Sequence, residues 1–244
     1  MSAGSVTGSP AIPASVSEIA DAGPRLGPRD IHLWLCHRDS AGSSEAFRRR
    51  VLSRYAPIDP QDWRFEFGEH GKPRLVDAPV PLEFNLSHSG EWLLCAVSAG
   101  TALGVDLEHT RRKRDVLRLA RRFFSAPEVA VLESLDGGER TERFFDYWTL
   151  KEAAVKARGG ALAPELRRRC FELHFPGAAN PGEIRPRFAR ETHPGHYYLV
   201  DALPDYRLAV CWLAEPGEGA PSLRVINLSG DPRPRTPLLR ATSV

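Results

Sequence analysis

Apolar and polar residues follow two different periods along this chain, and these periods predict an ordered series of strands and helices. Alternating or wholly apolar runs bounded by turn residues predict strands at residues 31–36, 82–87, 92–98, 102–109, 171–175, 197–201 and 207–212. Apolar residues that recur every three or four positions predict helices at residues 45–55, 115–124 and 141–158. Ser125 to Glu128 has capping-box spacing, which predicts a further helix ending near Leu135. The close spacing of the strands at 82–109 indicates an antiparallel meander.

A helix followed by three strands occurs twice, which predicts an α+β fold of two similar subdomains related by a pseudo-twofold duplication. We place these halves at residues 29–110 and 111–214, each as a helix packed on an antiparallel meander, with the active site in the cleft between them. Residues 1–28 are rich in Ser, Ala, Gly and Pro, which predicts a disordered leader. Residues 215–244 read as a loose tail rich in Pro and Gly, with one short strand at 223–226.

Composition narrows the class of protein. The 33 basic and 31 acidic residues nearly cancel, so general nucleic-acid binding is not expected. The sequence contains neither an apolar run long enough for a membrane span nor a secretory signal, so we expect a cytoplasmic protein with no membrane partner. The four cysteines are widely spaced, which is typical of buried free thiols in a reducing compartment. Two fused halves favour a monomer.

Two short segments carry the strongest chemical signal. Asp106 and Glu108 lie two apart on a predicted strand and therefore share one face. Neighbouring carboxylates repel each other unless a cation lies between them, although a solvated strand face is the ordinary alternative. Trp148, Glu152 and Lys156 lie at four-residue steps on the predicted helix. If strand and helix meet, three carboxylates and a lysine converge, an arrangement that suits a hard cation holding a phosphate ester.

Three further segments are candidates for binding. Lys72 lies in a Gly-Lys-Pro turn with Pro73, and this lysine either meets a phosphate or is simply solvated. His88 lies between two serines, Ser87 being the first, where hydroxyl and imidazole groups suit phosphate oxygens. The basic run Arg111, Arg112, Lys113 and Arg114 is either a solvated helix start or a docking surface for an acidic partner.

Taken in order, these motifs resemble those of 4′-phosphopantetheinyl transferases of the surfactin-synthetase-activating (Sfp) type. The matching segments are Gly71-Lys72-Pro73, Phe84 to Ser89, Gly104 to Glu108, Arg122 to Ser125, and Trp148 to Lys156. The resemblance implies a holo-[acyl-carrier-protein] synthase activity: transfer of the 4′-phosphopantetheine arm of coenzyme A to a serine of an acyl or peptidyl carrier protein, with release of adenosine 3′,5′-bisphosphate. It also implies the pseudo-twofold pair of α+β halves already predicted from the pattern.

The resemblance further implies roles for individual residues. Asp106, Glu108 and Glu152 would hold Mg²⁺, or Mn²⁺ in its place, against the pyrophosphate. Lys156 would contact the phosphate and stabilise developing charge. As a hypothesis on the mechanism, Glu152 or a metal-bound water accepts the serine proton. Ser87 and His88 would bind phosphates, and Lys72 with Pro73 would line the adenine side.

One departure from the family pattern keeps alternatives open. The chain lacks the basic helical segment that usually follows the first strand and grips the 3′-phosphate, and Arg49 is a candidate substitute. A degenerate transferase or a carrier-protein-binding module with weakened coenzyme A binding therefore remains possible. A metal-dependent nuclease is a further alternative, although its usual acid and lysine lie two apart on a strand rather than four apart on a helix. The pathway served, whether fatty-acid, polyketide or peptide synthesis, is not determined.

Overall fold

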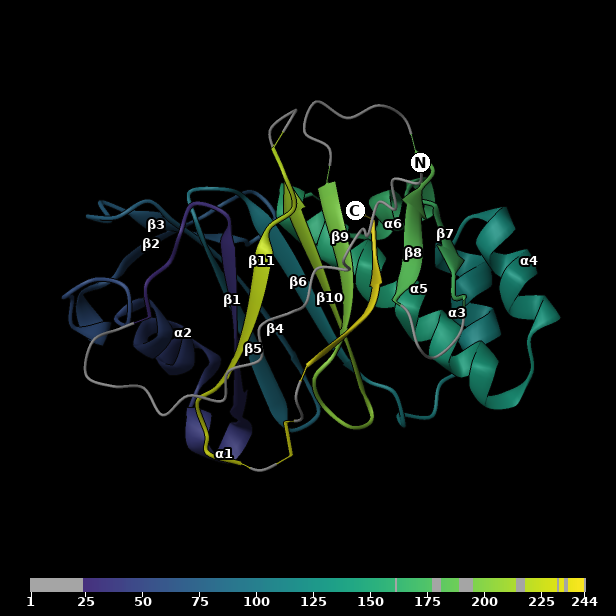
Figure 1. Cartoon of the computed structure of the whole chain (residues 1–244), viewed down its shortest axis with the longest axis horizontal. Coiled ribbons are helices and arrows are strands. Elements are labelled where there is room, and N and C mark those ends of the chain that lie inside the picture. Colours follow the sequence, from purple (N-terminus) through teal and green to yellow (C-terminus); the bar gives the residue numbers. More distant parts are fainter. Residues whose placement is uncertain are drawn as a thin grey trace, which may run out of the picture.

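The structure is a computed structural model that describes residues 24–160, 162–176, 181–188, 195–213, 218–231, 233–234 and 237–243. These residues form a four-stranded sheet, a six-stranded sheet and a two-stranded hairpin (Figure 1). The four-stranded sheet has the order β11 (Ser222–Asn227), β1 (Asp30–His37), β5 (Trp92–Ala99), β4 (Leu82–Ser89). The six-stranded sheet has the order β6 (Leu103–His109), β10 (Tyr206–Leu213), β9 (Gly195–Asp201), β12 (Leu238–Thr242), β8 (Gly182–Pro186), β7 (Phe171–His174). The hairpin pairs β2 (Arg64–Phe67) with β3 (Pro73–Val76).

Helices cover the outer faces of the two sheets, which confirms the predicted α+β class. The helices are α1 (Arg38–Ala41), α2 (Ser44–Leu52), a 3-10 turn at Pro60–Asp62, α3 (Val116–Phe123), α4 (Ala126–Ser134), α5 (Gly137–Arg158) and α6 (Leu162–Arg168). Figure 1 shows α1 and α2 on one side of the strands and α3 to α6 on the other. The predicted capping box begins α4, where the carboxylate of Glu128 accepts the backbone N–H of Ser125 at 2.9 Å. Helix α5 ends at Arg158 as predicted but begins four residues earlier than expected.

The apolar side chains form layers that follow from strand alternation. On β1, Ile31, Leu33 and Leu35 point into a central cluster shared by both sheets. The alternate residues Trp34 and Cys36 point outward into a second cluster, which α2 covers. A third cluster lies between the far face of the six-stranded sheet and α5. The central cluster therefore holds the two sheets face to face. Cys36, Cys95 and Cys211 are buried free thiols as predicted, whereas Cys170 is half-buried.

Strand β6 does not complete the meander that the sequence predicted. β4 and β5 pair antiparallel, but β6 pairs with β10 and so belongs to the other sheet. The reason is that β5 pairs with β1 along its other edge, so no edge of β5 is left for β6. Three side-chain oxygens of β4 accept backbone N–H groups of β6: Asn85 Oδ1 from Val105 at 2.9 Å, Ser87 Oγ from Leu107 at 3.1 Å, and Ser89 Oγ from His109 at 3.0 Å. This side-chain ladder joins the two sheets.

The last part of the chain is more ordered than predicted. The short strand expected at 223–226 is confirmed as β11, which pairs parallel with β1. The expectation of a loose tail was wrong for Leu238–Thr242, because β12 lies in the six-stranded sheet between β9 and β8. Local composition hides such a strand, since it is stabilised by neighbours that lie far away in sequence. Residues 1–23 of the predicted leader lie outside the described residues, and the division into halves at residue 110 stays a prediction.

Candidate active site

The acidic strand and the long helix meet, and a glycine makes this contact possible. Gly104 on β6 lies against the backbone of α5, and a Cβ added there would overlap Ala153 O and Ala157 N. Any other residue at this position would therefore push the helix off the strand. The contact brings the residues that follow Gly104 on β6 next to the last turns of α5.

Four of the predicted site residues converge at this contact. Asp106, which is buried, accepts a hydrogen bond at Oδ1 from Lys156 Nζ at 2.6 Å. The same Nζ lies 3.4 Å from Oε2 of Glu152, one helical turn earlier. Ser87 Oγ donates to Asp106 Oδ1 at 2.9 Å, so the ladder that joins the sheets also orients this carboxylate. A lysine thus lies between two carboxylates on two different elements.

This group contains two carboxylates, Asp106 and Glu152, and only one ammonium, that of Lys156. Burial first, and then the nearby Asp106 carboxylate, raise the pKa of Glu152 to about 7, although Lys156 acts to lower it. Burial alone would lower the pKa of Lys156, but Asp106 and Glu152 outweigh it and raise that pKa. Asp106 Oδ2 is buried and has no hydrogen-bond partner among the described residues. A buried carboxylate oxygen without a donor marks a position where a cation or a donor group fits.

Glu108 shares the acidic face but has a different partner. Its two carboxylate oxygens each lie 3.2 Å from Arg114 NH2, and Ser89 Oγ donates to Oε2 at 2.9 Å. Within the described parts of the chain, no group of three or more His, Cys, Asp or Glu residues is placed to hold a metal ion. Asp106 and Glu152 share Lys156 as their partner, through one oxygen of each carboxylate. A pair of carboxylates is enough for Mg²⁺, which keeps several waters and takes further oxygens from a substrate phosphate.

Lys72 is placed close to this contact but holds the backbone. Its Nζ donates to Leu103 O at 3.2 Å and to Ala157 O at 3.1 Å, at the start of β6 and the end of α5. Burial lowers the pKa of this lysine. Pro73 begins β3 directly after it. The structure thus shows Lys72 tying the hairpin to the strand–helix contact, and its role on an adenine side stays a prediction.

His88 and Arg49 do not reach the Asp106 group. His88 is exposed and, by strand alternation, points to the face of β4 opposite to Ser87. Arg49 is engaged in backbone contacts: its NH1 donates to the carbonyls of Pro60 at 2.9 Å, Gln61 at 3.2 Å and Trp63 at 2.8 Å. Arg49 also pairs with Glu45 at 2.9 Å. The binding roles of Ser87, His88 and Arg49 stay predictions.

Lys151 is a residue to which the sequence analysis assigned no function. Its ammonium is fully buried, lies 2.7 Å from Glu128 Oε2, and donates to the carbonyls of Leu166 at 2.7 Å and of Arg169. Glu128 in turn accepts the backbone N–H of Phe171 at 2.9 Å. This pair fixes α4, α6 and β7 to α5 immediately beside Glu152. The signal in the sequence was a lysine on a helix whose neighbours are mostly apolar.

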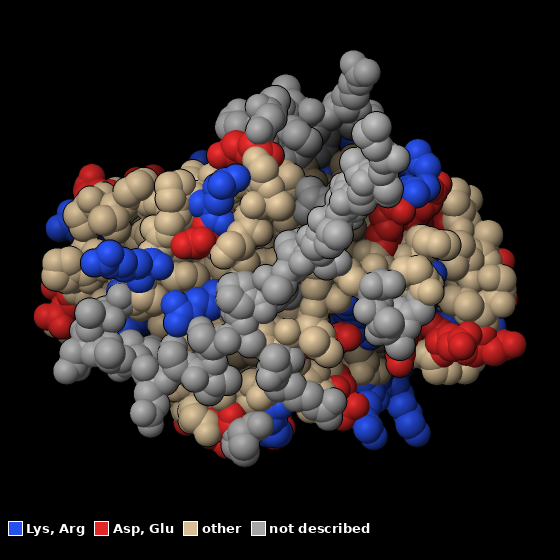
Figure 2. Space-filling model, viewed as in Figure 1, with Lys and Arg blue, Asp and Glu red and all other residues tan. Residues whose placement is uncertain are grey.

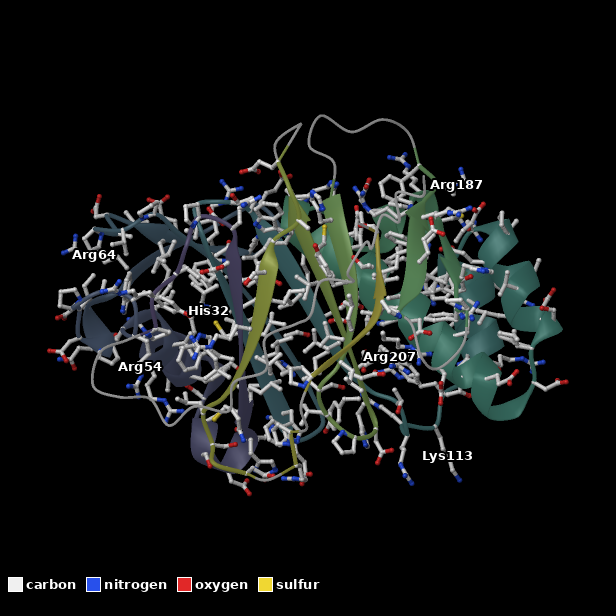
Figure 3. The ribbon with its side chains drawn as sticks, viewed as in Figure 1. His32, Arg54, Arg64, Lys113, Arg187 and Arg207 are labelled. Carbon is white, nitrogen blue, oxygen red and sulfur yellow. The ribbon has the colours of Figure 1, made fainter. Side chains whose placement is uncertain are left out.

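The basic run divides between internal pairing and open surface. Arg111 pairs with Asp205 at 2.8 Å, and Arg114 pairs with Glu108. Arg112 and Lys113 are exposed, and Figure 3 shows Lys113 pointing away from the strands at the edge of the molecule. Basic side chains also project from this edge in Figure 2. At this basic run lies a depression of about 440 Å³, which is lined by Arg112, Lys113, Arg114, Asp115, Arg118 and Leu119.

The fold and the site define an α+β protein with a carboxylate–lysine group between a strand of one sheet and the helix that covers it. Residues 102–211, which contain this group, match the 4′-phosphopantetheinyl transferase superfamily (ACPS). The chain is 34% identical over 183 residues to the 4′-phosphopantetheinyl transferase Sfp of Bacillus subtilis, covering 75% of this chain and 77% of that protein. It is 40% identical over 129 residues to the transferase HetI of a Nostoc species, covering 52% of this chain and 54% of that protein. The chain therefore belongs to the 4′-phosphopantetheinyl transferase superfamily.

A solved holo-(acyl-carrier-protein) synthase from Bacillus anthracis aligns with a TM-score of 0.39 at 20% identity, covering 47% of this chain and 96% of that chain. This likeness is too distant to place any residue. Among the described helices, none has the length and apolar character needed to cross a membrane.

Proposed function

We propose that this chain transfers the 4′-phosphopantetheine arm of coenzyme A to a serine hydroxyl of an acyl or peptidyl carrier protein, and that the reaction takes place at the Asp106, Glu152 and Lys156 group. The observation that carries this proposal is the convergence of these side chains from β6 and α5 within the segment that matches the family. The chemistry fits, since a diphosphate is negatively charged and its transfer depends on positioning and charge stabilisation.

A divalent cation fits the donor set. Asp106, whose buried Oδ2 has no donor among the described residues, and Glu152 would hold Mg²⁺ or Mn²⁺. When bound, the ion would neutralise phosphate charge and align the attacking and leaving oxygens. The metal ligands implied by the family also include Glu108. This carboxylate would bind the ion only by giving up its contact with Arg114.

The chain's own side chains supply the remaining steps. Lys156 carries a pKa raised by two carboxylates, so it stays charged and suits the stabilisation of charge that develops on the transferred phosphate. Glu152, with a pKa near 7, suits the acceptance of a proton from the serine hydroxyl. Asp106 holds Lys156 in place through the 2.6 Å contact.

The remaining predicted contacts surround this group. Lys72 and Pro73 are proposed for the adenine side, and Ser87 with His88 for the phosphates. Arg49 would bind the 3′-phosphate only by leaving its backbone carbonyls. The exposed Arg112 and Lys113, together with Arg111 and Arg114, are proposed to face an acidic carrier protein. We expect a cytoplasmic monomer that uses neither nucleic acid nor membrane.

The test is to mix the protein with Mg²⁺, coenzyme A and an apo carrier protein and to weigh the carrier by mass spectrometry. The wild type should add one phosphopantetheine arm, and Asp106→Ala should lose at least roughly 10²-fold in rate, the scale for removing one electrostatic group from an active site. Asp62→Asn, at an exposed carboxylate of the 3-10 turn, is the matched control and should transfer normally.

The outcomes separate the rival functions. Near-normal transfer by a soluble Asp106→Ala variant would refute the assignment of the site. Carrier binding without any mass increase, weakened by salt but not by Asp106→Ala, would identify a carrier-binding module. Cleavage of plasmid DNA with Mg²⁺ in place of carrier loading would identify a nuclease.

A further inference from the structure

The contact between Arg114 and Glu108 is built into the fold. The Arg114 side chain is 18% exposed and that of Glu108 is 14% exposed, so this is not a loose surface pair. Arg114 directly precedes Asp115, the N-cap of α3, and its guanidinium carbon lies 5.8 Å from the Phe145 ring centre on α5. Ser89 orients the same carboxylate from β4. Glu108 is therefore held by both Arg114 and Ser89.

Arg114 takes the position beside Glu108 that a metal ion would need. It reaches both carboxylate oxygens, whereas Lys156 reaches one oxygen of each of its two partners. A guanidinium does not release its proton in proteins, so this charge persists at every working pH. A cation can therefore approach Glu108 only by displacing Arg114 or by binding against the electrostatic repulsion of its guanidinium.

We propose that Arg114 competes with the divalent cation for Glu108 and thereby sets the metal affinity of the enzyme. This inference rests on the divalent-cation site proposed above. In the absence of metal, Arg114 neutralises Glu108. A cation that enters the site is held by Asp106 and Glu152 alone until Arg114 leaves Glu108. When Arg114 leaves Glu108, its charge joins the depression that Arg114 already lines with Arg112, Lys113 and Arg118. Arg114 is thus a positioning residue for the metal site.

The experiment measures Mn²⁺ affinity directly, by the electron paramagnetic resonance signal of free Mn²⁺ in a titration without coenzyme A or carrier. Arg114→Gln should bind Mn²⁺ about tenfold more tightly than the wild type, the scale of one lost charge-assisted hydrogen bond. Arg112→Gln removes the same charge from an exposed neighbour and should change the affinity by less than about twofold, because exposed charges are screened.

A second pair of variants separates competition from general charge repulsion. In a Glu108→Gln background, Arg114→Gln should no longer tighten Mn²⁺ binding, since the contested carboxylate is gone. If Arg114→Gln does not fold, as judged by circular dichroism, Arg114→Lys keeps the charge on a more flexible side chain and should tighten binding by a smaller factor.

Each contrary result has its own meaning. Unchanged or weaker Mn²⁺ binding by folded Arg114→Gln would overturn the competition. An equal gain in the Glu108→Gln background would reduce the effect to long-range repulsion and overturn it as well. A wild type that binds no Mn²⁺ but still loads a carrier would remove the metal site, and with it this inference, while leaving the transferase activity standing.

Discussion

Glu152→Gln should stabilise the metal-free protein against unfolding, although it removes a proposed active-site group. Glu152 is a carboxylate with 14% side-chain exposure beside Asp106, and its neighbour Lys156 does not fully compensate. A glutamine keeps the shape and an accepting oxygen but carries no charge. The variant therefore relieves the repulsion that raises the pKa of Glu152.

The magnitude follows from that pKa. Raising it from 4.5 to about 7 costs the folded state about 3 kcal/mol once Glu152 is ionised, at about 1.36 kcal/mol for each pKa unit. Between pH 4.5 and 7 the unfolded chain has released this proton while the folded chain retains it. Because the folded state then binds more protons, its stability falls as pH rises through this window. Above pH 7 the full cost remains, and below pH 4.5 it disappears.

The assay is urea unfolding of the wild type and Glu152→Gln in the presence of a chelator, at about pH 5 and pH 8. We expect an advantage for the variant of about 2–3 kcal/mol at the higher pH and about 1 kcal/mol or less at the lower pH. Glu139→Gln, at an exposed position in the first turn of the same helix, is the control and should show no such pH dependence. An advantage that is absent at pH 8, or equal at both pH values, would refute this account of the site.

Two other changes test how the site is assembled. Gly104→Ala should destabilise the protein by about 3 kcal/mol or more, or prevent folding, because its Cβ would overlap Ala153 O. The control Gly138→Ala should be tolerated, because an added Cβ there meets nothing within 4 Å. Equal urea midpoints for the two variants would contradict the close contact at Gly104. Lys151→Met should cost about 3–5 kcal/mol because it leaves Glu128 buried without its cation. Adding Glu128→Gln should restore much of that loss in the same urea assay, and no recovery would mean that the buried pair is not the cause.

Several parts of the site could be predicted because they depend on local spacing. The two-residue period places Asp106 and Glu108 on one face of β6, and the four-residue step places Glu152 below Lys156 on α5. Both are properties of the backbone and need no knowledge of neighbours. The family motifs then indicated that these two segments meet, and the structure shows that Gly104 makes the meeting possible.

Other parts could not be predicted because they depend on which groups a fold leaves unpaired. Strand β5 pairs with β1 instead of β6, and β6 pairs with β10. Three backbone N–H groups of β6 are then bonded by the side chains of Asn85, Ser87 and Ser89. The alternation of residues 102–109 is compatible equally with pairing to β5 and with pairing to β10. Strand β12 likewise depends on β8 and β9, which lie far away in sequence.

The sequence by itself determined the strands and the helix that carry the site, the acidic face of one strand and the charged stripe of one helix, because each follows from a period of two or nearly four residues. Only the tertiary structure decided which charges neutralise one another: Lys156 lies between Asp106 and Glu152, Arg114 holds Glu108, and Lys151 is buried against Glu128. The interaction energy of two charges weakens with the distance between them and with their exposure to water. The order of residues along the chain specifies neither quantity directly.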